Sequence, residues 1–210
     1  MINIIDITDY TSWDDIVKSF NNYDVYYLSG YAKAFQIHGD GEPHLLFYEN
    51  NDLRAIYVYM KRTTFVKDVY DSITPYGYGG LLFEGDDNIE NLNVFWHEYI
   101  QKMTEENIID NFVRYHPLLA NSIPMKKISN VIDLGKTIAM DISSPDVIWE
   151  NIHSKNRNMI RKAEKNGIEI HHGKSMELFD KFIDIYNSNN VSIFFTKHSC
   201  TAFFFSLFNW

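Results

Sequence analysis

The strand predicted over residues 53–60 most constrains the fold, because it carries apolar side chains on both of its faces. "HLLFYE", the turn "NND" and "LRAIYVYMKR" together predict a β-hairpin. In its second strand two sets of residues alternate: Leu53, Ala55, Tyr57 and Tyr59 against Arg54, Ile56, Val58 and Met60. A strand that is apolar on both faces is expected at the centre of a sheet.

Helical patterns flank this hairpin. "TSWDDIVKSF" predicts a short helix capped by Thr11 or Ser12, and "SGYAKAFQIH" predicts a second helix capped by Ser29. Further on, apolar residues recur at the spacing of one buried helix face, namely Leu92, Phe95, Trp96, Tyr99, Ile100 and Met103. "IIDNFVRYHP" then predicts a strand.

The later part of the chain repeats this mixture of elements. "KISNVIDLG" and "KTIAMDIS" predict a hairpin about Gly135, and "SPDVIWENIH" predicts a helix with Ser144 as its cap. A helix over 154–166 stopped by Gly167, the strand "IEIHHG" and the helix "SMELFDKFIDIYN" follow. We therefore expect an α+β fold with a mixed sheet and two domains, 1–143 and 144–210.

Composition excludes several classes of function. The formal net charge of -9 argues against a duplex DNA-binding protein, because phosphate neutralisation supplies most non-specific affinity. The single cysteine, Cys200, excludes an internal disulfide, and His171 and His172 point to opposite faces of a predicted strand, so we expect no metal site. Since no apolar run reaches the length of a membrane helix, we expect a cytoplasmic protein.

The segment "SKNRNMIRKAEKNG", residues 154–167, gathers positive charge inside this acidic chain. On a helical wheel Lys155, Arg157, Arg161, Lys162 and Lys165 lie opposite the apolar arc. Neighbours of like charge at i,i+4 repel, so a bound anion would stabilise the helix, and the helix N-terminus also favours anions. The segment therefore predicts a phosphate or diphosphate site; the alternative is a solvated polar face.

Two glycine-containing segments are candidate ligand loops. In "TPYGYGG" Gly77, Gly79 and Gly80 allow close approach of a ligand, while Tyr76 and Tyr78 offer flat faces; the alternative is a tight turn between strands. "QIHGDG", residues 36–41, matches the pyrophosphate pattern of GNAT acetyltransferases, but it follows a helix and leads into a strand. It is therefore predicted to be a helix stop and turn.

Taken together, these segments resemble the Fem-type family (FemA, FemB, FemX) of aminoacyl-tRNA-dependent transferases, which add amino acids to peptidoglycan precursors. The resemblance is strongest over residues 154–187, and "YDSITPYGYGG" and "NFVRYHPLL" resemble related GNAT-like proteins. It implies a GNAT-like mixed sheet with flanking helices, followed by an incomplete second GNAT-like unit. A truncated sheet would leave an open edge, through which we expect self-association.

The resemblance also implies a function and a set of site residues. It places Lys155, Arg157, Arg161 and Lys162 at the diphosphate of a nucleotide- or lipid-linked muropeptide, with Lys33 in the region of a further binding lysine. The loop and cleft residues expected to contact this precursor are Tyr76, Gly77, Tyr78, Gly79, Arg114 and His116. No catalytic base is identified, and a hydrogen-bonded structural role is the alternative for His116.

The acyl donor implied is aminoacyl-tRNA, with acyl-CoA as the alternative, and no bound cofactor is expected. A non-catalytic remnant that binds the precursor without transferring to it is the second functional hypothesis. The resemblance implies a protein that is cytoplasmic or peripheral to the inner face of the membrane.

Overall fold

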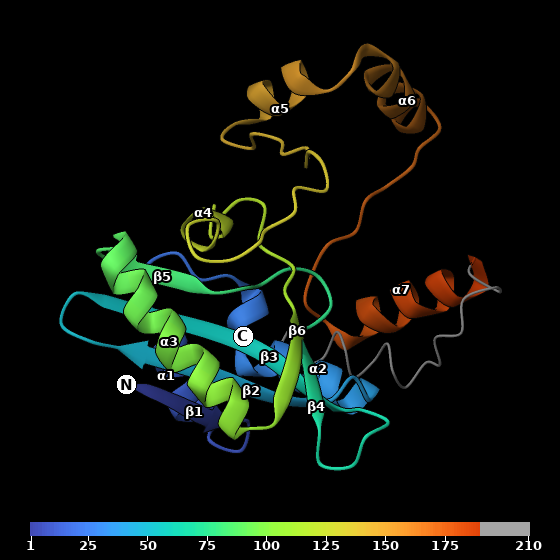
Figure 1. Ribbon diagram of the computed structural model, residues 1–210. Coiled ribbons are helices and arrows are strands. Elements are labelled where there is room, and N and C mark those ends of the chain that lie inside the picture. Colours follow the sequence, from blue (N-terminus) through green and yellow to red (C-terminus); the bar gives the residue numbers. More distant parts are fainter. Residues whose placement is uncertain (190–210) are drawn as a thin grey trace. The chain divides into compact units, whose positions relative to one another are not determined.

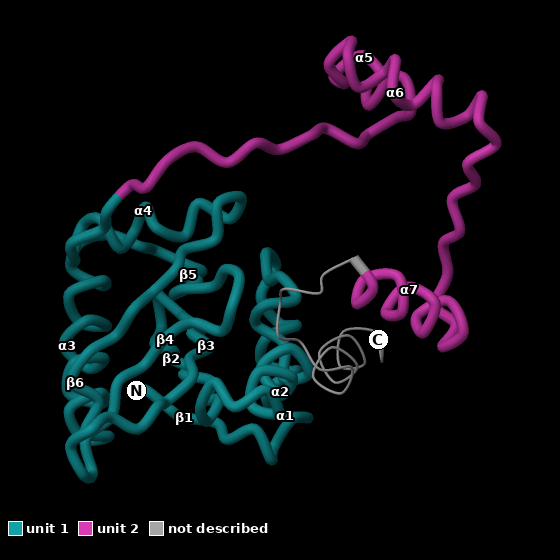
Figure 2. The backbone as a smooth tube through the Cα atoms, turned by 90° about the vertical axis from the view of Figure 1, so that its right-hand side faces the viewer, with its two compact units in different colours: residues 1–132, 194–210 teal, residues 133–193 magenta. Residues whose placement is uncertain are grey.

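The computed structural model describes residues 1–189, and the predictions for Cys200 and the residues around it lie outside this range. The described residues divide into two compact units, 1–132 and 133–189 (Figure 2). The predicted division into 1–143 and 144–210 stays a prediction.

The first unit contains a six-stranded mixed sheet with helices on both faces (Figure 1). Its strands are β1 (Ile2–Asp6), β2 (Glu42–Glu49), β3 (Leu53–Thr63), β4 (Tyr70–Ile73), β5 (Leu82–Gly85) and β6 (Ile108–Phe112). Its helices are α1 (Tyr10–Lys18), the 3-10 helix η1 (Val25–Tyr27), α2 (Ser29–His38), α3 (Ile89–Glu105) and α4 (Ser122–Met125). The α+β class with a mixed sheet is therefore confirmed.

β3 is the centre of this sheet. It pairs antiparallel with β2 along one side, and with both β4 and β5 along the other. β4 pairs in parallel with β6, so the sheet order is β1-β2-β3-β4-β6. The hairpin and the central strand predicted from the alternation of apolar residues are both confirmed.

Two hydrophobic cores lie on opposite faces of the sheet. α3 packs Leu92, Phe95, Tyr99 and Met103 against the face that carries Tyr57 and Tyr59. α1 and α2 cover the opposite face, which carries Ile56 and Val58, and Figure 1 shows these helices behind the sheet and α3 in front. The apolar stripe predicted for α3 is largely buried, although Ile100 is 48% exposed.

Two predicted helix caps are wrong by a few residues. α1 begins after Asp9, whose Oδ1 accepts a hydrogen bond from the Ser12 amide at 3.2 Å, so neither Thr11 nor Ser12 is the cap. Ser29 is the first residue of α2, and its amide donates to Asp14 of α1 at 2.9 Å. Asp14 of the neighbouring helix thus supplies an acceptor for an amide at the start of α2. The local sequence does not reveal this partner.

The described part of the second unit contains helices and no strand. These helices are α5 (Pro145–Asn151), α6 (Ser154–Lys165) and α7 (Met176–Asn189). The Ser144 cap is confirmed by its hydrogen bond from the Val147 amide at 3.2 Å, and Gly167 follows α6 with φ of 68°. The helix predicted over 154–166 is therefore confirmed over Ser154–Lys165, with Asn166 as its C-cap.

The hairpin predicted about Gly135 and the strand predicted at 168–173 do not form in the structure. Their alternating apolar residues stay exposed, with Leu134 at 91%, Ile138 at 96% and Ile170 at 88%. A strand needs a hydrogen-bonded neighbour and a surface that covers its apolar face, and an isolated hairpin is marginal in water. No strand in the described part of the chain pairs with either segment.

Candidate functional site

The segment that contains "TPYGYGG" interrupts one edge of the β3 ladder. β4 pairs with residues 60–63 of β3 and β5 pairs with residues 53–56, so the same side of β3 meets two short strands in succession. Residues 74–81 leave the sheet between them. The segment therefore connects two strands, as the alternative to a ligand loop predicts, but the connection is eight residues long instead of a tight turn.

Hydrogen bonds from three distant elements hold this loop. The Tyr31 hydroxyl donates to the Tyr76 carbonyl at 2.6 Å, and the Asn121 side-chain amide donates to the Gly79 carbonyl at 2.7 Å. The Gly79 amide donates to the Arg114 carbonyl at 2.9 Å. Burial raises the pKa of Tyr31, so its hydroxyl stays protonated and able to donate. The loop is therefore fixed before any ligand binds.

Its glycines make room for tyrosine rings. A Cβ on Gly77, which has φ of +102°, would lie 2.4 Å from a ring carbon of Tyr26, and a Cβ on Gly80 would lie 2.7 Å from Tyr115. Only glycine avoids both the overlap and the strained backbone. Close packing within the protein thus accounts for Gly77, which sequence reasoning had assigned to close approach of a ligand.

His116 has both ring nitrogens engaged inside the protein. Nδ1 accepts a hydrogen bond from the Leu118 amide at 3.1 Å, and Nε2 lies 3.2 Å from an Asp24 carboxylate oxygen. Because Nδ1 accepts, the proton of a neutral ring resides on Nε2 and is donated to Asp24. The side chain is 6% exposed, so the geometry favours the structural alternative for this histidine.

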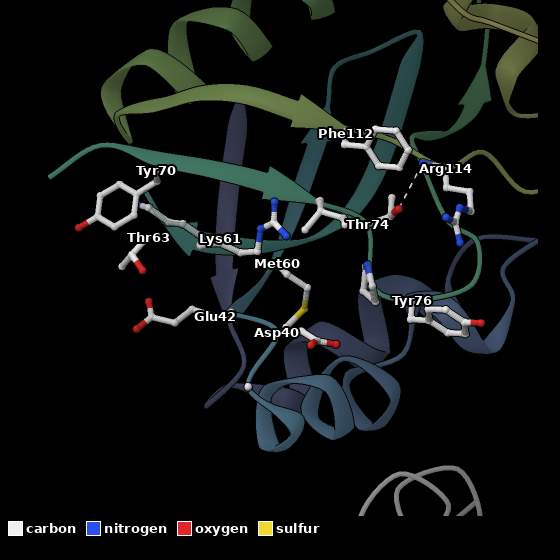
Figure 3. Close-up of a pocket in the computed structure, with 15 residues that line it drawn as sticks. Asp40, Glu42, Met60, Lys61, Thr63, Tyr70, Thr74, Tyr76, Phe112 and Arg114 are labelled. Carbon is white, nitrogen blue, oxygen red and sulfur yellow. Dashed lines mark hydrogen bonds between the residues drawn. The ribbon is translucent and has the colours of Figure 1, made fainter. Parts of the chain in front are cut away.

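A cavity of about 700 Å³ lies beside the same loop (Figure 3). Its walls come from the α2–β2 turn, the paired ends of β3 and β4, and the residues at the end of β6. The polar lining residues include Asp40, Glu42, Lys61, Arg62, Thr74 and Arg114. In Figure 3, Glu42 lies at one end of the cavity and Arg114 and Tyr76 lie at the other.

Two cations of this pocket are paired with carboxylates. Arg62 makes a bidentate contact with Asp71 at 2.8 and 2.7 Å, and this hydrogen bonding raises the pKa of Arg62. Lys61 donates to Glu106 at 2.9 Å, and this hydrogen bond lowers the pKa of Glu106. Both cations are therefore largely neutralised by their partners.

Three charged groups remain for a ligand. Arg114 has no carboxylate of residues 1–189 within ion-pair distance, and its guanidinium donates a long hydrogen bond of 3.5 Å to the Gly77 carbonyl. Glu42 likewise forms no ion pair in this range. Asp40 accepts from His38 through Oδ1 at 2.9 Å, which leaves Oδ2. The pocket thus offers one cation and two carboxylates.

The expected site residues do not all gather here. Arg114 and Tyr76 line the pocket, and Tyr76 is 70% exposed. Tyr78 packs against Tyr26 and His116 instead, with ring centroids 5.9 and 5.7 Å away. Lys33 is exposed on α2, donates to Gln36 at 2.7 Å and does not line the cavity.

Sequence reasoning missed the carboxylates of the pocket. Asp40 and Glu42 follow the end of α2 at Gly39, whose φ of 100° marks the helix stop predicted for "QIHGDG". This turn brings its acidic residues to the cavity. The only signal in the sequence was an acidic residue on each side of Gly41, a pattern too common to single out.

The basic residues of α6 lie in the second unit and divide into two groups. Arg157 Nη1 donates to the backbone carbonyls of Trp149 and Glu150 at 3.1 and 3.3 Å. The Arg161 guanidinium lies over the Trp149 ring, 5.2 Å from its centroid. Both arginines therefore contact α5, although Arg161 remains exposed, as Lys155 and Lys162 are.

Comparisons of the chain with protein-family models, with curated proteins and with solved structures found no match. Within residues 1–189 there is no cluster of three or more histidine, cysteine, aspartate or glutamate residues able to hold a metal ion. None of the helices described in that range has the length and apolar character needed to cross a bilayer.

Proposed function

We propose that this chain is an acyl or aminoacyl transferase of Fem/GNAT type that acts on an amine of a phosphate-bearing cell-envelope precursor. The observation that carries the proposal is the charge arrangement of the pocket in the first unit. Arg114 supplies a cation without an ion pair for a phosphate or carboxylate, and Glu42 supplies a carboxylate without one for an amine. A substrate that carries both an anionic group and an amine would contact Arg114 at one end of the pocket and Glu42 at the other.

The order of elements in the first unit supports a GNAT-like fold as part of this proposal. Two helices, α1 and α2, separate β1 from β2, and antiparallel strands follow. The chain then crosses through α3 to β6, which pairs in parallel with β4. This is the mixed sheet with flanking helices that the resemblance implies. A second GNAT-like unit stays a proposal for the remainder of the chain.

The reaction proposed is aminolysis of an ester. The amine nitrogen attacks the carbonyl carbon of the aminoacyl ester, a C–N bond forms and the ester C–O bond breaks. The proton lost by the amine is balanced by the proton gained by the departing RNA hydroxyl. Glu42 would accept hydrogen bonds from the amine and orient it, while Arg114 would hold the anionic part of the precursor.

The turn from β5 to α3 disfavours acyl-CoA as the donor. A strand-to-helix turn is where a GNAT protein would present backbone amides to pyrophosphate. In this chain the turn carries Asp86 and Asp87, and the cap Asn88 already accepts from the Asn91 amide at 2.9 Å. These carboxylates would repel a pyrophosphate, which favours aminoacyl-tRNA among the two donors.

Calorimetric titration with a nucleotide-linked muropeptide tests the binding part of the proposal. We expect Arg114→Gln to weaken binding about tenfold or more, because a charged hydrogen bond contributes roughly 1.5–3 kcal/mol. Lys67→Gln is the matched control, since Lys67 is 92% exposed and does not line the pocket. If the two variants bind the precursor equally tightly, the assignment of the precursor site to this pocket is wrong.

Transfer itself is tested by incubating the chain with charged tRNA and precursor and measuring the precursor mass. A gain of one aminoacyl residue is expected for the wild type. Glu42→Gln should slow the gain while leaving the fold intact, as judged by circular dichroism. Binding of the precursor without any gain in mass would favour the non-catalytic alternative.

A further inference from the structure

Three lysines of α6 form an exposed row, here called the lysine stripe: Lys155, Lys162 and Lys165. None has a carboxylate of residues 1–189 within ion-pair distance. Glu164, the one acidic residue of the helix, lies at i+2 from Lys162 and directly precedes Lys165. Side chains at these separations do not face each other on a helix, so Glu164 does not neutralise the stripe.

The arginines of α6 serve a different purpose. Arg157 donates to the carbonyl groups of Trp149 and Glu150, in the last turn of α5, where carbonyl groups lack partners within the helix. Arg161 stacks on Trp149 and donates to Asn158 at 3.2 Å. The stripe therefore consists of the three lysines, while the arginines make contacts within α5 and α6.

The length of the stripe does not match a single diphosphate. Lys155 and Lys162 are seven residues apart, and Lys155 and Lys165 ten residues apart, so the stripe extends about 15 Å along the helix axis. The two phosphorus atoms of a diphosphate share a bridging oxygen, and one diphosphate would reach only part of this row. A nucleic-acid strand, in contrast, repeats its charge roughly every 3.4 Å along a duplex axis.

We propose that the lysine stripe of α6 binds the phosphodiester backbone of a single-stranded nucleic acid. Lysine is a flexible point charge, suited to successive phosphates without reading sequence. A single strand is favoured over a duplex because the chain as a whole carries a net charge of -9, which opposes the denser charge of a duplex. The inference does not rest on the proposed function, because strand binding by the stripe is expected whether or not the chain transfers an acyl group.

Fluorescence anisotropy of the full chain with a labelled single-stranded RNA and a DNA of the same length tests this proposal. We expect the two strands to bind with similar affinity, because the contacts are to phosphates. The slope of log affinity against log salt should be about -2 for three lysines, giving a loss of roughly 15-fold between about 50 and about 200 mM salt. Replacing all three lysines by glutamine should abolish both the binding and the slope.

The control is Lys174→Gln, which removes one exposed lysine of the second unit outside α6. It should leave the affinity within about twofold, while each single stripe variant should reduce the slope by about 0.7. Glutamine matches lysine in helix propensity, and circular dichroism verifies that α6 persists.

Three results would overturn the proposal. The first is unchanged strand binding in the triple variant. The second is displacement of the strand by inorganic diphosphate at equal concentration, which would indicate a diphosphate site. The third is binding to vesicles of anionic lipid in the absence of strand binding. Failure of the transfer assay with intact strand binding would affect only the proposed function.

Discussion

Arg157 donates through Nη1 to the backbone carbonyl of Trp149 at 3.1 Å, eight residues earlier in the chain. An arginine expected at a phosphate instead satisfies the last turn of the preceding helix. The same tryptophan carries the Arg161 guanidinium on its ring. Both arginines are therefore expected to contribute little to anion binding by α6.

The double variant Arg157→Ala, Arg161→Ala should bind a nucleotide-linked muropeptide as tightly as the wild type does, because both arginines are engaged with α5. It should also loosen α5, so that backbone amides there exchange about fivefold faster, corresponding to roughly 1 kcal/mol. Calorimetry and hydrogen exchange measure the two effects. Weaker precursor binding together with unchanged hydrogen exchange in α5 would indicate that the arginines contact the ligand.

Gly77→Ala should destabilise the first unit more than Gly39→Ala does. The two glycines have nearly the same φ, 102° and 100°, so the left-handed backbone strain of about 1–2 kcal/mol is common to both variants. A Cβ at Gly39 meets nothing within 4 Å, whereas a Cβ at Gly77 overlaps the Tyr26 ring. Urea denaturation should show an additional loss of about 1–3 kcal/mol for Gly77→Ala.

The comparison isolates packing from backbone conformation. Equal losses in the two variants would mean that the Tyr26 ring moves aside freely. In that case the loop over residues 74–81 is less tightly held than its hydrogen bonds indicate.

His44 should make the free energy of unfolding fall as the pH is lowered through 6.5. Both ring nitrogens are buried without a hydrogen-bond partner, and the ring stacks on Tyr59. Burial, followed by the charge of Lys61, lowers the pKa of His44 below its ordinary value of 6.5, despite opposing effects of Asp6, Glu106 and Glu42. Below pH 6.5 the unfolded chain therefore binds more protons than the folded one, which favours unfolding.

His44→Phe removes this titration and the two unsatisfied nitrogens while retaining an aromatic ring. Its unfolding free energy, measured by urea denaturation on both sides of pH 6.5, should depend less steeply on pH than that of the wild type. The matched control is His97→Gln, which removes one imidazole from the exposed side of α3. A variant with the same pH dependence as the wild type would contradict the assignment to His44.

Asp71→Asn should strengthen binding of a phosphate-bearing ligand to the pocket. The substitution removes the negative charge that neutralises Arg62 while preserving the size of the side chain. Arg62 is 42% exposed, so solvent screening limits the effect to about 0.5–1 kcal/mol, or a two- to fivefold gain in affinity.

Asp68→Asn serves as the comparison for Asp71→Asn, because Asp68 is 75% exposed and lies outside the pocket. It removes the same unit of negative charge from the protein. A similar gain in both variants would indicate a general charge effect, and no gain in either would place the bound phosphate away from Arg62.

Local and periodic features of the chain could be predicted because their causes lie within a few residues. The two apolar faces of β3, the buried stripe of α3 and the Ser144 cap follow from side-chain spacing. The hairpin expected over 127–143 and the strand expected at 168–173 do not form, because pairing does not have a local cause. Alternation indicates which face could be buried, but pairing requires a neighbouring strand.

The sequence by itself determined the α+β class, the central position of β3 and the helical state of the basic segment, since periodicity and capping act locally. Only the tertiary structure decided what the charged groups do. It brings Asp40 and Glu42 of the α2–β2 turn and Arg114, which follows β6, to one cavity. It also directs Arg157 and Arg161 to α5 while leaving the lysine stripe exposed. Contacts between distant residues depend on the path of the chain, and local spacing carries no record of that path.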